Sequence, residues 1–315
     1  MRNAHRMFSA RTVAALAAWY ILTLTGCGMA PRLKGTSETA VVAFTAGGVR
    51  GIDHPRFSRA TAYRGLWVAD AARDVDTWGI YFLEPYDPNR IPVLFVHGIG
   101  GTPLDFLTML DALDRTKFQA WVFHYPTALR LGELSFALRG LLADLERKHR
   151  FGALVVVAHS MGGLVARGYL NGEQQDSDAV SRRLLITISS PWQGQAWAQS
   201  GARFMPGGPQ SWIDLSPESD FLVSVRVPLR QVPHYVFFGF RSGASLLATG
   251  SSDGRISLAS QMPTWIQDQA ARCWGYDADH TGILAHPAAL ARFKVLLASE
   301  AGRLNAHGVP AAYSR

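Results

Sequence analysis

The chain has 315 residues, of which 48% are hydrophobic and 17% are charged. This composition indicates a globular protein with a large core and excludes a disordered or fibrous chain. The formal net charge of +7 raises nucleic acid or anionic lipid as partners. Lysine and arginine are scattered along the chain, however, and no basic run with interleaved aromatic residues occurs, so the sequence does not support nucleic-acid binding.

Residues 1–26 are predicted to be a signal peptide that is removed before folding. Arg2, Arg6 and Arg11 precede the apolar run TVAALAAWYILTLTG, which is short for a bilayer span and ends in small residues. A buried or membrane-spanning helix is the alternative. Removal takes away three arginines and no acidic residue, which leaves a net charge of +4 on the rest.

The end of this segment, Leu24 to Cys27, resembles the lipobox of bacterial lipoproteins. The resemblance implies that Cys27 is lipidated after cleavage and attaches the chain to a membrane, because several acyl chains anchor stably where one is marginal. Gly28 follows, and the resemblance then implies the periplasmic side of the outer membrane in a bacterial cell envelope. The alternative is a plain secretory signal in which Cys27 occurs by chance.

Cys273 is then the one remaining cysteine, and it cannot form an intramolecular disulfide. We expect a small buried hydrophobic residue there, with a reactive thiol as the alternative. Residues 27–75 mix short apolar pieces without a clear period. They are predicted to be a tether and an N-terminal extension that packs on the main domain.

Residues 76–300 alternate between short apolar β-rich runs and amphipathic segments, and 301–315 form a C-terminal tail. The alternation predicts an α/β fold with a mostly parallel, doubly wound sheet and helices on both faces. We expect strands at residues 79–85, 91–97, 118–125, 153–158, 183–189 and 234–240, and helices at 102–114, 133–150, 162–170 and 287–301.

Residues 191–231 interrupt this alternation with a long segment rich in glycine and proline. Loops of this length in compact domains usually have their own structure or a function. Trp192, Trp197 and Trp212 lie in it and would be costly to leave in water. We therefore predict a cap over an apolar pocket, with a surface excursion as the alternative.

Ser160 is the candidate nucleophile. It lies in VVVAHSMGGLVAR, directly after a predicted strand and before a predicted helix, which is the setting of a nucleophile elbow. Ala158 stands where the usual GxSxG pattern has glycine, but alanine adds one methyl group and Gly162 and Gly163 are kept. A serine that merely caps the helix is the alternative.

These motifs resemble the α/β-hydrolase superfamily, and within it bacterial lipases and the deacylase-like group related to GPI inositol-deacylases. The resemblance runs from about Ile80 to about Ala298 and includes HGIGG at residues 97–101. It implies that the main-chain N–H of Ile99 donates to an oxyanion and that His97 is structural. The second donor is the N–H of Met161, the residue after the nucleophile.

The acid of a catalytic triad follows the serine and precedes the histidine in this superfamily's chain order. Asp253 in GSSDGRISLASQ resembles the lipase pattern for that acid, but Asp-Gly is also a common turn. The competing aspartates are Asp214, Asp220, Asp277 and Asp279.

His280 in DADHTGILAHP is the candidate base, because it resembles the lipase pattern of a histidine followed shortly by an apolar pair. His286, immediately before Pro287 at a helix start, is the main rival, and His307 lies in the tail. An exposed loop histidine is the alternative for His280.

The expected function is therefore a serine hydrolase that cleaves carboxylic esters, with lipid or other apolar acyl esters as substrates and no cofactor. The ten histidines show no HxxxH spacing and no CxxC occurs, so no metal site is predicted. Two alternatives stay open: an inactive hydrolase-like envelope lipoprotein that binds lipid or a partner, and a thioesterase or amidase that uses the same residues. The sequence leaves the oligomeric state open.

Overall fold

The computed structural model describes residues 44–68, 77–173, 182–241 and 251–305. The predicted signal peptide, Cys27 with the tether, and most of the C-terminal tail lie outside these residues. Within them, no helix combines the length and the apolar character needed to cross a membrane.

The core of the molecule is an eight-stranded sheet with the strand order β1-β2-β4-β3-β5-β6-β7-β8. In the described sheet β2 pairs antiparallel with β4, and the other neighbouring pairs are parallel. The strands span Phe44–Val49 (β1), Trp78–Phe82 (β2), Ile91–Val96 (β3), Phe118–His124 (β4), Leu154–His159 (β5), Arg183–Ile188 (β6), His234–Phe240 (β7) and Arg272–Asp277 (β8).

The central strands β3, β5 and β6 are buried at every residue. Their sequences are almost continuous apolar runs, which is typical of parallel strands covered on both faces. The register of β5 places Val155 beside Val93 of β3 and Leu184 of β6. Because β3 and β5 end side by side, the loops that follow them meet at one edge of the sheet.

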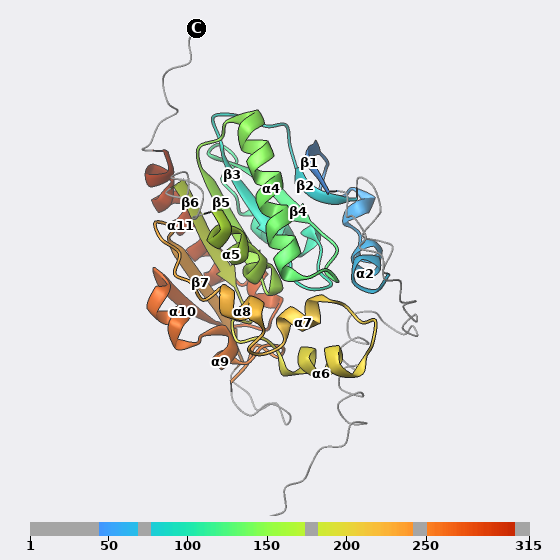
Figure 1. Ribbon diagram of the computed structural model, residues 1–315. Helices are drawn as coiled ribbons and strands as arrows, with labels where there is room; N and C mark the ends of the chain where they lie inside the picture. Colours follow the sequence, from blue (N-terminus) through green and yellow to red (C-terminus); the bar gives the residue numbers. More distant parts are fainter. Residues whose placement is uncertain (1–43, 69–76, 174–181, 242–250, 306–315) are drawn as a thin grey trace, which may run out of the picture.

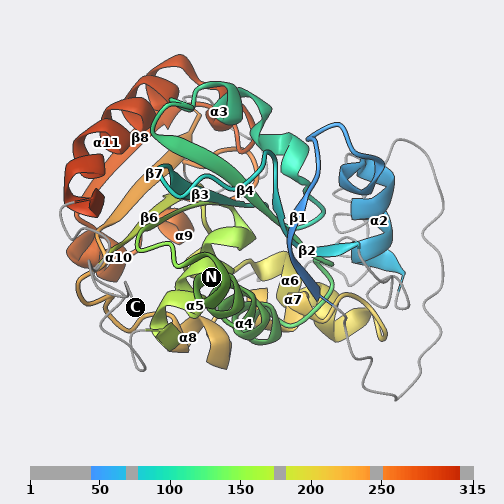
Figure 2. The same cartoon turned by 90° about the horizontal axis from the view of Figure 1, so that it is seen from above.

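Helices cover both faces of the sheet (Figures 1 and 2). Helices α4 (Leu131–His149) and α5 (Met161–Glu173) lie on one face, and α3 (Leu107–Asp111) and α11 (Pro287–Asn305) lie on the other. The core accordingly divides into two clusters, one on each side of the strands. Helix α4 contributes Leu134, Leu138 and Leu145 to the first cluster, with the helical spacing expected of a one-sided apolar stripe.

All six predicted strands are present, and the structure adds two edge strands that the sequence pattern did not predict. In β1 the sequence FTAGGV contains two glycines and is at most half-buried, and β8, RCWGYD, is mostly exposed or half-buried. Edge strands lack the continuous apolar run that marks a buried strand. Strand β1 and helix α2 (Arg59–Trp67) belong to the predicted N-terminal extension, which packs on the sheet.

The predicted helix at 102–114 is shorter than expected and begins as a 3-10 turn at Pro103–Phe106, before α3. Thr102 and Asp105 form a capping box there. On β8, Cys273 is half-buried, and burial raises the pKa of its thiol. It is therefore only partly the buried hydrophobic residue expected.

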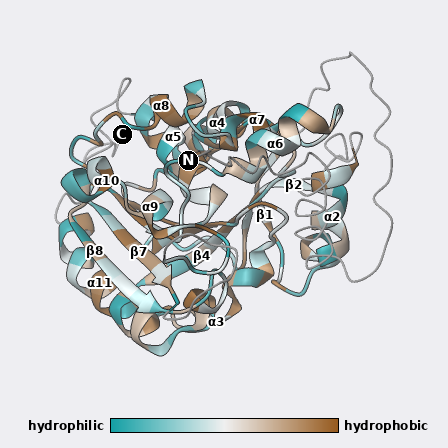
Figure 3. Cartoon of the chain, turned by 90° about the horizontal axis from the view of Figure 1, so that it is seen from below, coloured by the Kyte–Doolittle hydropathy of each residue, from teal (hydrophilic) through white to brown (hydrophobic). Residues whose placement is uncertain are grey.

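The segment at residues 191–231 folds into three short helices between β6 and β7: α6 (Ala196–Phe204), α7 (Ser211–Leu215) and α8 (Asp220–Ser224). Seen from below, these helices lie on the same side of the sheet as α4 and α5 (Figure 3). Trp192 and Trp212 are buried in the core cluster, and Trp197 packs at its margin.

Two buried charged side chains, Asp214 and Arg167, form polar contacts that hold this insert to the body of the protein. Asp214 of α7 is buried and accepts hydrogen bonds from the N–H of Leu131, at the start of α4, and from the Arg130 guanidinium, at 2.6 Å each. Arg167 of α5 is also buried and donates to the carbonyl of Val225 at 2.6 Å. Burial lowers the pKa of Arg167 to about 10. The insert is thus anchored at α7 and again just after α8.

Candidate active site

Ser160 occupies a sharp turn between β5 and α5. Its φ of 55° lies in the left-handed region, which is costly for a residue other than glycine. Two main-chain hydrogen bonds hold the turn: the N–H of Ser160 donates to the carbonyl of Ile188 at 2.8 Å, and the N–H of Gly163 donates to the carbonyl of Ser160 at 3.0 Å. The strand, the turn and the helix therefore have the arrangement predicted for an elbow.

The glycines beside the serine are required by close contacts. A Cβ on Gly162 would lie 2.4 Å from the main-chain oxygens of Val96 and His97, and one on Gly98 would lie 2.9 Å from the Cβ of Ser160. Ala158 instead lies within β5, fully buried in the core cluster. Its methyl group is part of the packing, so the GxSxG pattern can lose its first glycine here without loss of the turn.

Asp253 and His280 form a buried pair. The Nδ1 of His280 lies 2.7 Å from an Asp253 carboxylate oxygen, while the other oxygen accepts the N–H groups of Arg255 at 2.9 Å and Ile256 at 2.7 Å. The N–H of His280 donates to the carbonyl of Asp253 at 2.9 Å. Burial alone would raise the pKa of Asp253, but the hydrogen bonds to His280 and the main chain and the attraction of His280 leave it lowered.

His159 is a functional candidate that the sequence interpretation missed, although it directly precedes the candidate nucleophile. Its Nε2 donates to the carbonyl of His280 at 2.8 Å, and the two rings lie 4.6 Å apart. Burial, with the charge of His280 as the second cause, lowers the pKa of His159 to about 3. A neutral His159 therefore supports the loop of His280 from behind.

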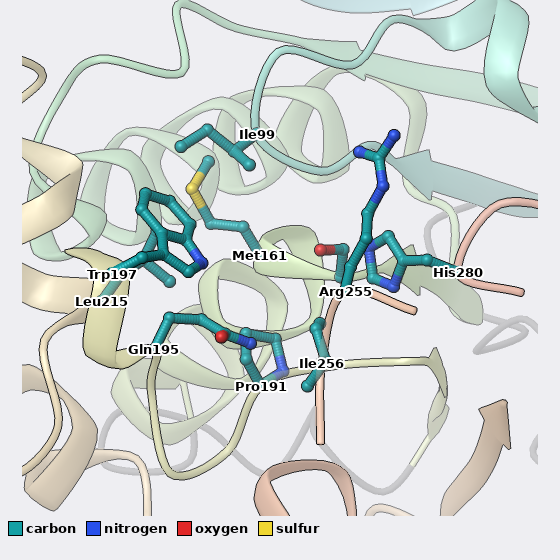
Figure 4. Close-up of a pocket in the computed structure, with 10 residues that line it drawn as sticks. Ile99, Met161, Pro191, Gln195, Trp197, Leu215, Arg255, Ile256 and His280 are labelled. Atoms are coloured by element: carbon teal, nitrogen blue, oxygen red, sulfur yellow. The ribbon is translucent and has the colours of Figure 1, made fainter. Parts of the chain in front are cut away.

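Ser160 and His280 line one pocket together with Ile99 and Met161. It contains about 280 Å3 of space, part of which is open to solvent. Four of the five residues predicted for catalysis thus share a pocket, and the fifth, Asp253, is fully buried behind His280. Pro191, Gln195, Trp197 and Leu215 also line the pocket and come from the segment predicted to be a cap, whereas Arg255 and Ile256 were not predicted to lie there (Figure 4).

The rival residues lie elsewhere or have other partners. Asp214 binds Arg130 and the start of α4, and the other three competing aspartates, Asp220, Asp277 and Asp279, are exposed. His286 packs against Tyr276, with ring centroids 5.4 Å apart. His307 lies outside the described residues.

His97 begins the HGIGG loop after β3 and is enclosed by aromatic rings. Its Nδ1 donates to the carbonyl of Gly98 at 3.0 Å, and its Nε2 lies 3.3 Å from the Nδ1 of His124. Tyr125 stacks on it at 4.3 Å and donates its hydroxyl to the His97 carbonyl. Burial lowers the pKa of His97 to about 4, so the ring is neutral at pH 7 and serves to hold the loop that carries Ile99.

No cluster of three or more histidine, cysteine or acidic side chains in the described residues is arranged to bind a metal ion. Ser160 and His280 are the nucleophilic and proton-accepting side chains among the residues that line the pocket.

None of the curated proteins compared with this chain matches it. Among solved structures, lipase BlEst2 of Bacillus licheniformis in its mature form superposes with a TM-score of 0.55 at 19% identity, covering 69% of this chain and 97% of that one. Its propeptide form gives 0.50 at 18% identity, covering 64% and 48%. A carboxylesterase structure from Nitrososphaera gargenis gives 0.47 at 12% identity, covering 70% and 94%.

At these identities the similarity to the two BlEst2 structures concerns the fold alone. The family model described as the alpha/beta hydrolase family matches residues 93–293, which span the strands from β3 to β8, Ser160, Asp253 and His280. The chain therefore belongs to the alpha/beta hydrolase family.

Proposed function

We propose that this protein is a serine hydrolase that cleaves carboxylic esters through an acyl-enzyme. The observation that supports the proposal is the Asp253–His280 pair at 2.7 Å, whose histidine shares a pocket with a serine held at a left-handed φ. A serine needs an adjacent base to become a nucleophile, and the base needs an orienting group. Each of these groups has a candidate at the site.

In the proposed reaction the Oγ of Ser160 attacks the ester carbonyl while the Nε2 of His280 takes the hydroxyl proton. Asp253 keeps the Nδ1 proton of His280 in place and stabilises the imidazolium that forms. The oxyanion accepts hydrogen bonds from the N–H groups of Ile99 and Met161. The His280 proton then passes to the alcohol oxygen as the ester C–O bond breaks. Water, activated by His280, releases the acid and restores the serine.

The acyl part of the substrate is apolar in this proposal. Ile99, Met161, Trp197 and Leu215 supply apolar surface in the pocket, and burial of apolar surface contributes about 25 cal/mol per Å2. Trp197 and Leu215 belong to the insert, so the insert forms part of the acyl site. This is the role expected of a cap.

Labelling with a fluorophosphonate probe tests the nucleophile. We expect the wild type and Ser299→Ala, a control at a serine on α11 remote from the pocket, to be labelled, and Ser160→Ala to remain unlabelled and inactive. Equal labelling of wild type and Ser160→Ala would refute the proposal. An inactive binding protein would react in none of these forms.

Two further measurements define the reaction. Rates on an ester, a thioester and an amide of one acyl group should be highest for the ester; a faster thioester or amide would reassign the reaction. An acyl-length series of p-nitrophenyl esters, run below and above substrate solubility, should favour the longer chains. Activity confined to short soluble esters would replace the lipase proposal with a carboxylesterase.

We also propose that lipidated Cys27 anchors the protein in a bacterial cell envelope. The lipobox-like segment from Leu24 to Cys27 supports this. Replacement of Cys27 with serine should release the protein from the membrane fraction, and unchanged fractionation would contradict the anchor.

A further inference from the structure

The HGIGG loop at residues 97–101 carries the proposed oxyanion donor, and the direction of that donor is set by its own peptide unit. The N–H of Ile99 and the carbonyl of Gly98 belong to one trans peptide, so they point in opposite directions. The Gly98 carbonyl accepts the N–H of Gly101 and the Nδ1–H of His97, each at 3.0 Å. These two bonds therefore fix the direction of the Ile99 N–H.

The same loop lies directly against the candidate nucleophile. Ile99 lines the pocket with Ser160 and Met161 (Figure 4), and a Cβ on Gly98 would lie 3.3 Å from the Oγ of Ser160. A main-chain donor in this loop is therefore close to the position where an oxyanion would form. Such a donor acts at about 3 Å from the oxyanion, so a small rotation of its peptide is enough to lose the hydrogen bond.

His124, the last residue of β4, sets the tautomer of His97. A carbonyl oxygen only accepts hydrogen bonds, so the Nδ1 of His97 carries the proton that bonds Gly98, and the Nε2 of His97 is left as an acceptor. The Nδ1 of His124 lies 3.3 Å from that Nε2 and is the donor that matches it. Without this donor the proton of His97 could move to Nε2, and the Gly98 carbonyl would lose one of its two bonds.

Both histidines are neutral and enclosed by the core. Burial lowers the pKa of His97 to about 4 and that of His124 well below its usual value, so each ring carries a single N–H at pH 7. The His124 ring packs against Trp78, with centroids 4.8 Å apart, and against Phe57, with centroids 5.5 Å apart. The donor that faces His97 is thus held in place.

Thr127, in the loop after β4, holds the other side of Ile99. This buried residue accepts the N–H of Gly100 through its Oγ1 at 3.1 Å. The bond fixes the peptide unit that follows Ile99, whereas the bonds to the Gly98 carbonyl fix the unit that precedes it. Two residues near the end of β4 therefore support the loop on both sides of the proposed donor.

We propose that His124 and Thr127 are positioning residues that aim the Ile99 N–H at the oxyanion. Neither is among the residues that line the pocket. His124 acts through His97 on the carbonyl of Gly98, and Thr127 acts on the N–H of Gly100. This inference rests on the proposed esterase function, in which Ile99 is an oxyanion donor.

Paired variants separate the two hydrogen bonds from the packing around them. Thr127→Val keeps the shape of the side chain but loses the acceptor, whereas Thr127→Ser keeps the hydroxyl. His124→Leu loses the donor, whereas His124→Asn keeps an N–H close to the position of Nδ1. We expect Thr127→Val and His124→Leu to lower kcat with little change in KM, because neither residue touches the substrate. Thr127→Ser and His124→Asn should restore most of the loss.

A thiono ester shows whether the oxyanion contact is what has changed. The assay compares kcat/KM for 4-nitrophenyl butyrate with kcat/KM for 4-nitrophenyl thionobutyrate, which has sulfur in place of the carbonyl oxygen. Sulfur accepts hydrogen bonds weakly, so a misdirected donor should harm the oxygen ester more. We expect the ratio of the two values to fall about tenfold in Thr127→Val and in His124→Leu, which is part of the loss that removal of a whole donor causes.

Ser135→Ala is the control for a loss of stability alone. Ser135 is buried on α4 and donates to the carbonyls of Leu131 at 2.8 Å and Val165 at 3.0 Å. Its Tm should fall, while the ratio of the oxygen ester to the thiono ester stays that of the wild type. A wild-type ratio in folded Thr127→Val and His124→Leu would overturn the inference.

Amide hydrogen exchange of the peptide that contains residues 97–101 gives a readout that does not need catalysis. Exchange should be faster in Thr127→Val and His124→Leu than in the wild type, and unchanged in Ser135→Ala. Equal exchange in all four proteins would overturn the inference. Absence of ester cleavage by the wild type would refute the esterase proposal, whereas the exchange rates would still test the support of the loop.

Discussion

Replacement of Asp253 with asparagine tests the proposed roles of the buried pair most directly. One carboxylate oxygen of Asp253 accepts two main-chain N–H groups, from Arg255 and Ile256. In the variant the amide oxygen must take that position, because an amide NH2 there would face two donors. The NH2 group then faces the Nδ1 of His280, across the 2.7 Å that separates Nδ1 from the carboxylate in the wild type.

This orientation forces the wrong tautomer of His280. An Nδ1 that accepts from the amide leaves the proton on Nε2, which can no longer take the proton of Ser160. The corresponding change in a serine protease lowers kcat about ten-thousandfold, which corresponds to about 5 kcal/mol in the activation free energy. We expect a loss of that order here, with the fold retained because the side chains have the same shape.

The assay is kcat on a soluble butyrate ester, together with Tm and the rate of fluorophosphonate labelling. Asp277→Asn is the control, because Asp277 is exposed and it should keep wild-type activity. A folded Asp253→Asn variant that lost less than about tenfold in kcat would refute the tautomer argument. It would also indicate that a residue other than Asp253 orients His280.

Three further outcomes follow from the contacts around the site. Gly98→Ala should lower kcat with little change in Tm, because the added Cβ would lie 2.9 Å from the Cβ of Ser160. Gly162→Ala should instead lower the free energy of unfolding by about 3 kcal/mol, because its Cβ would lie 2.4 Å from two main-chain oxygens. Equal effects of the two variants on kcat and on Tm would contradict this. Asp214→Ala should cost about 2–3 kcal/mol in the free energy of unfolding because it leaves the buried Leu131 N–H unpaired. Arg130→Ala should cost a comparable amount, because it leaves the buried Asp214 carboxylate without its cationic partner, and urea unfolding of both variants measures the two losses. Burial lowers the pKa of His97 to about 4 and of His159 to about 3, from 6.5. Below pH 6.5 these two histidines are therefore protonated in the unfolded chain but still neutral in the folded chain. The free energy of unfolding should therefore be highest above pH 6.5 and fall as the pH drops toward 4, by about 1.4 kcal/mol per pH unit for each such proton. A free energy of unfolding that is constant between pH 7 and 5 would refute this.

The sequence by itself predicted the elements whose residue pattern is set by their immediate surroundings. A strand buried on both faces must be apolar along its length, so β3, β5 and β6 were visible as apolar runs. The turn at Ser160 needs small residues beside it, so the sequence AHSMGG at residues 158–163 predicted the elbow although Ala158 replaces the usual glycine. The edge strands β1 and β8 face water along part of their length, so their residues need not be continuously apolar and the sequence did not predict them as strands.

What only the tertiary structure decided depends on contacts between distant parts of the chain. Several aspartates followed Ser160 in the required order, and the hydrogen bond to His280 separates Asp253 from the rest. The support of His280 by His159 joins residues 121 positions apart, and no local pattern encodes that contact. Asp253 and His280 meet because the loops after β7 and β8, which are neighbouring parallel strands, converge at one edge of the sheet.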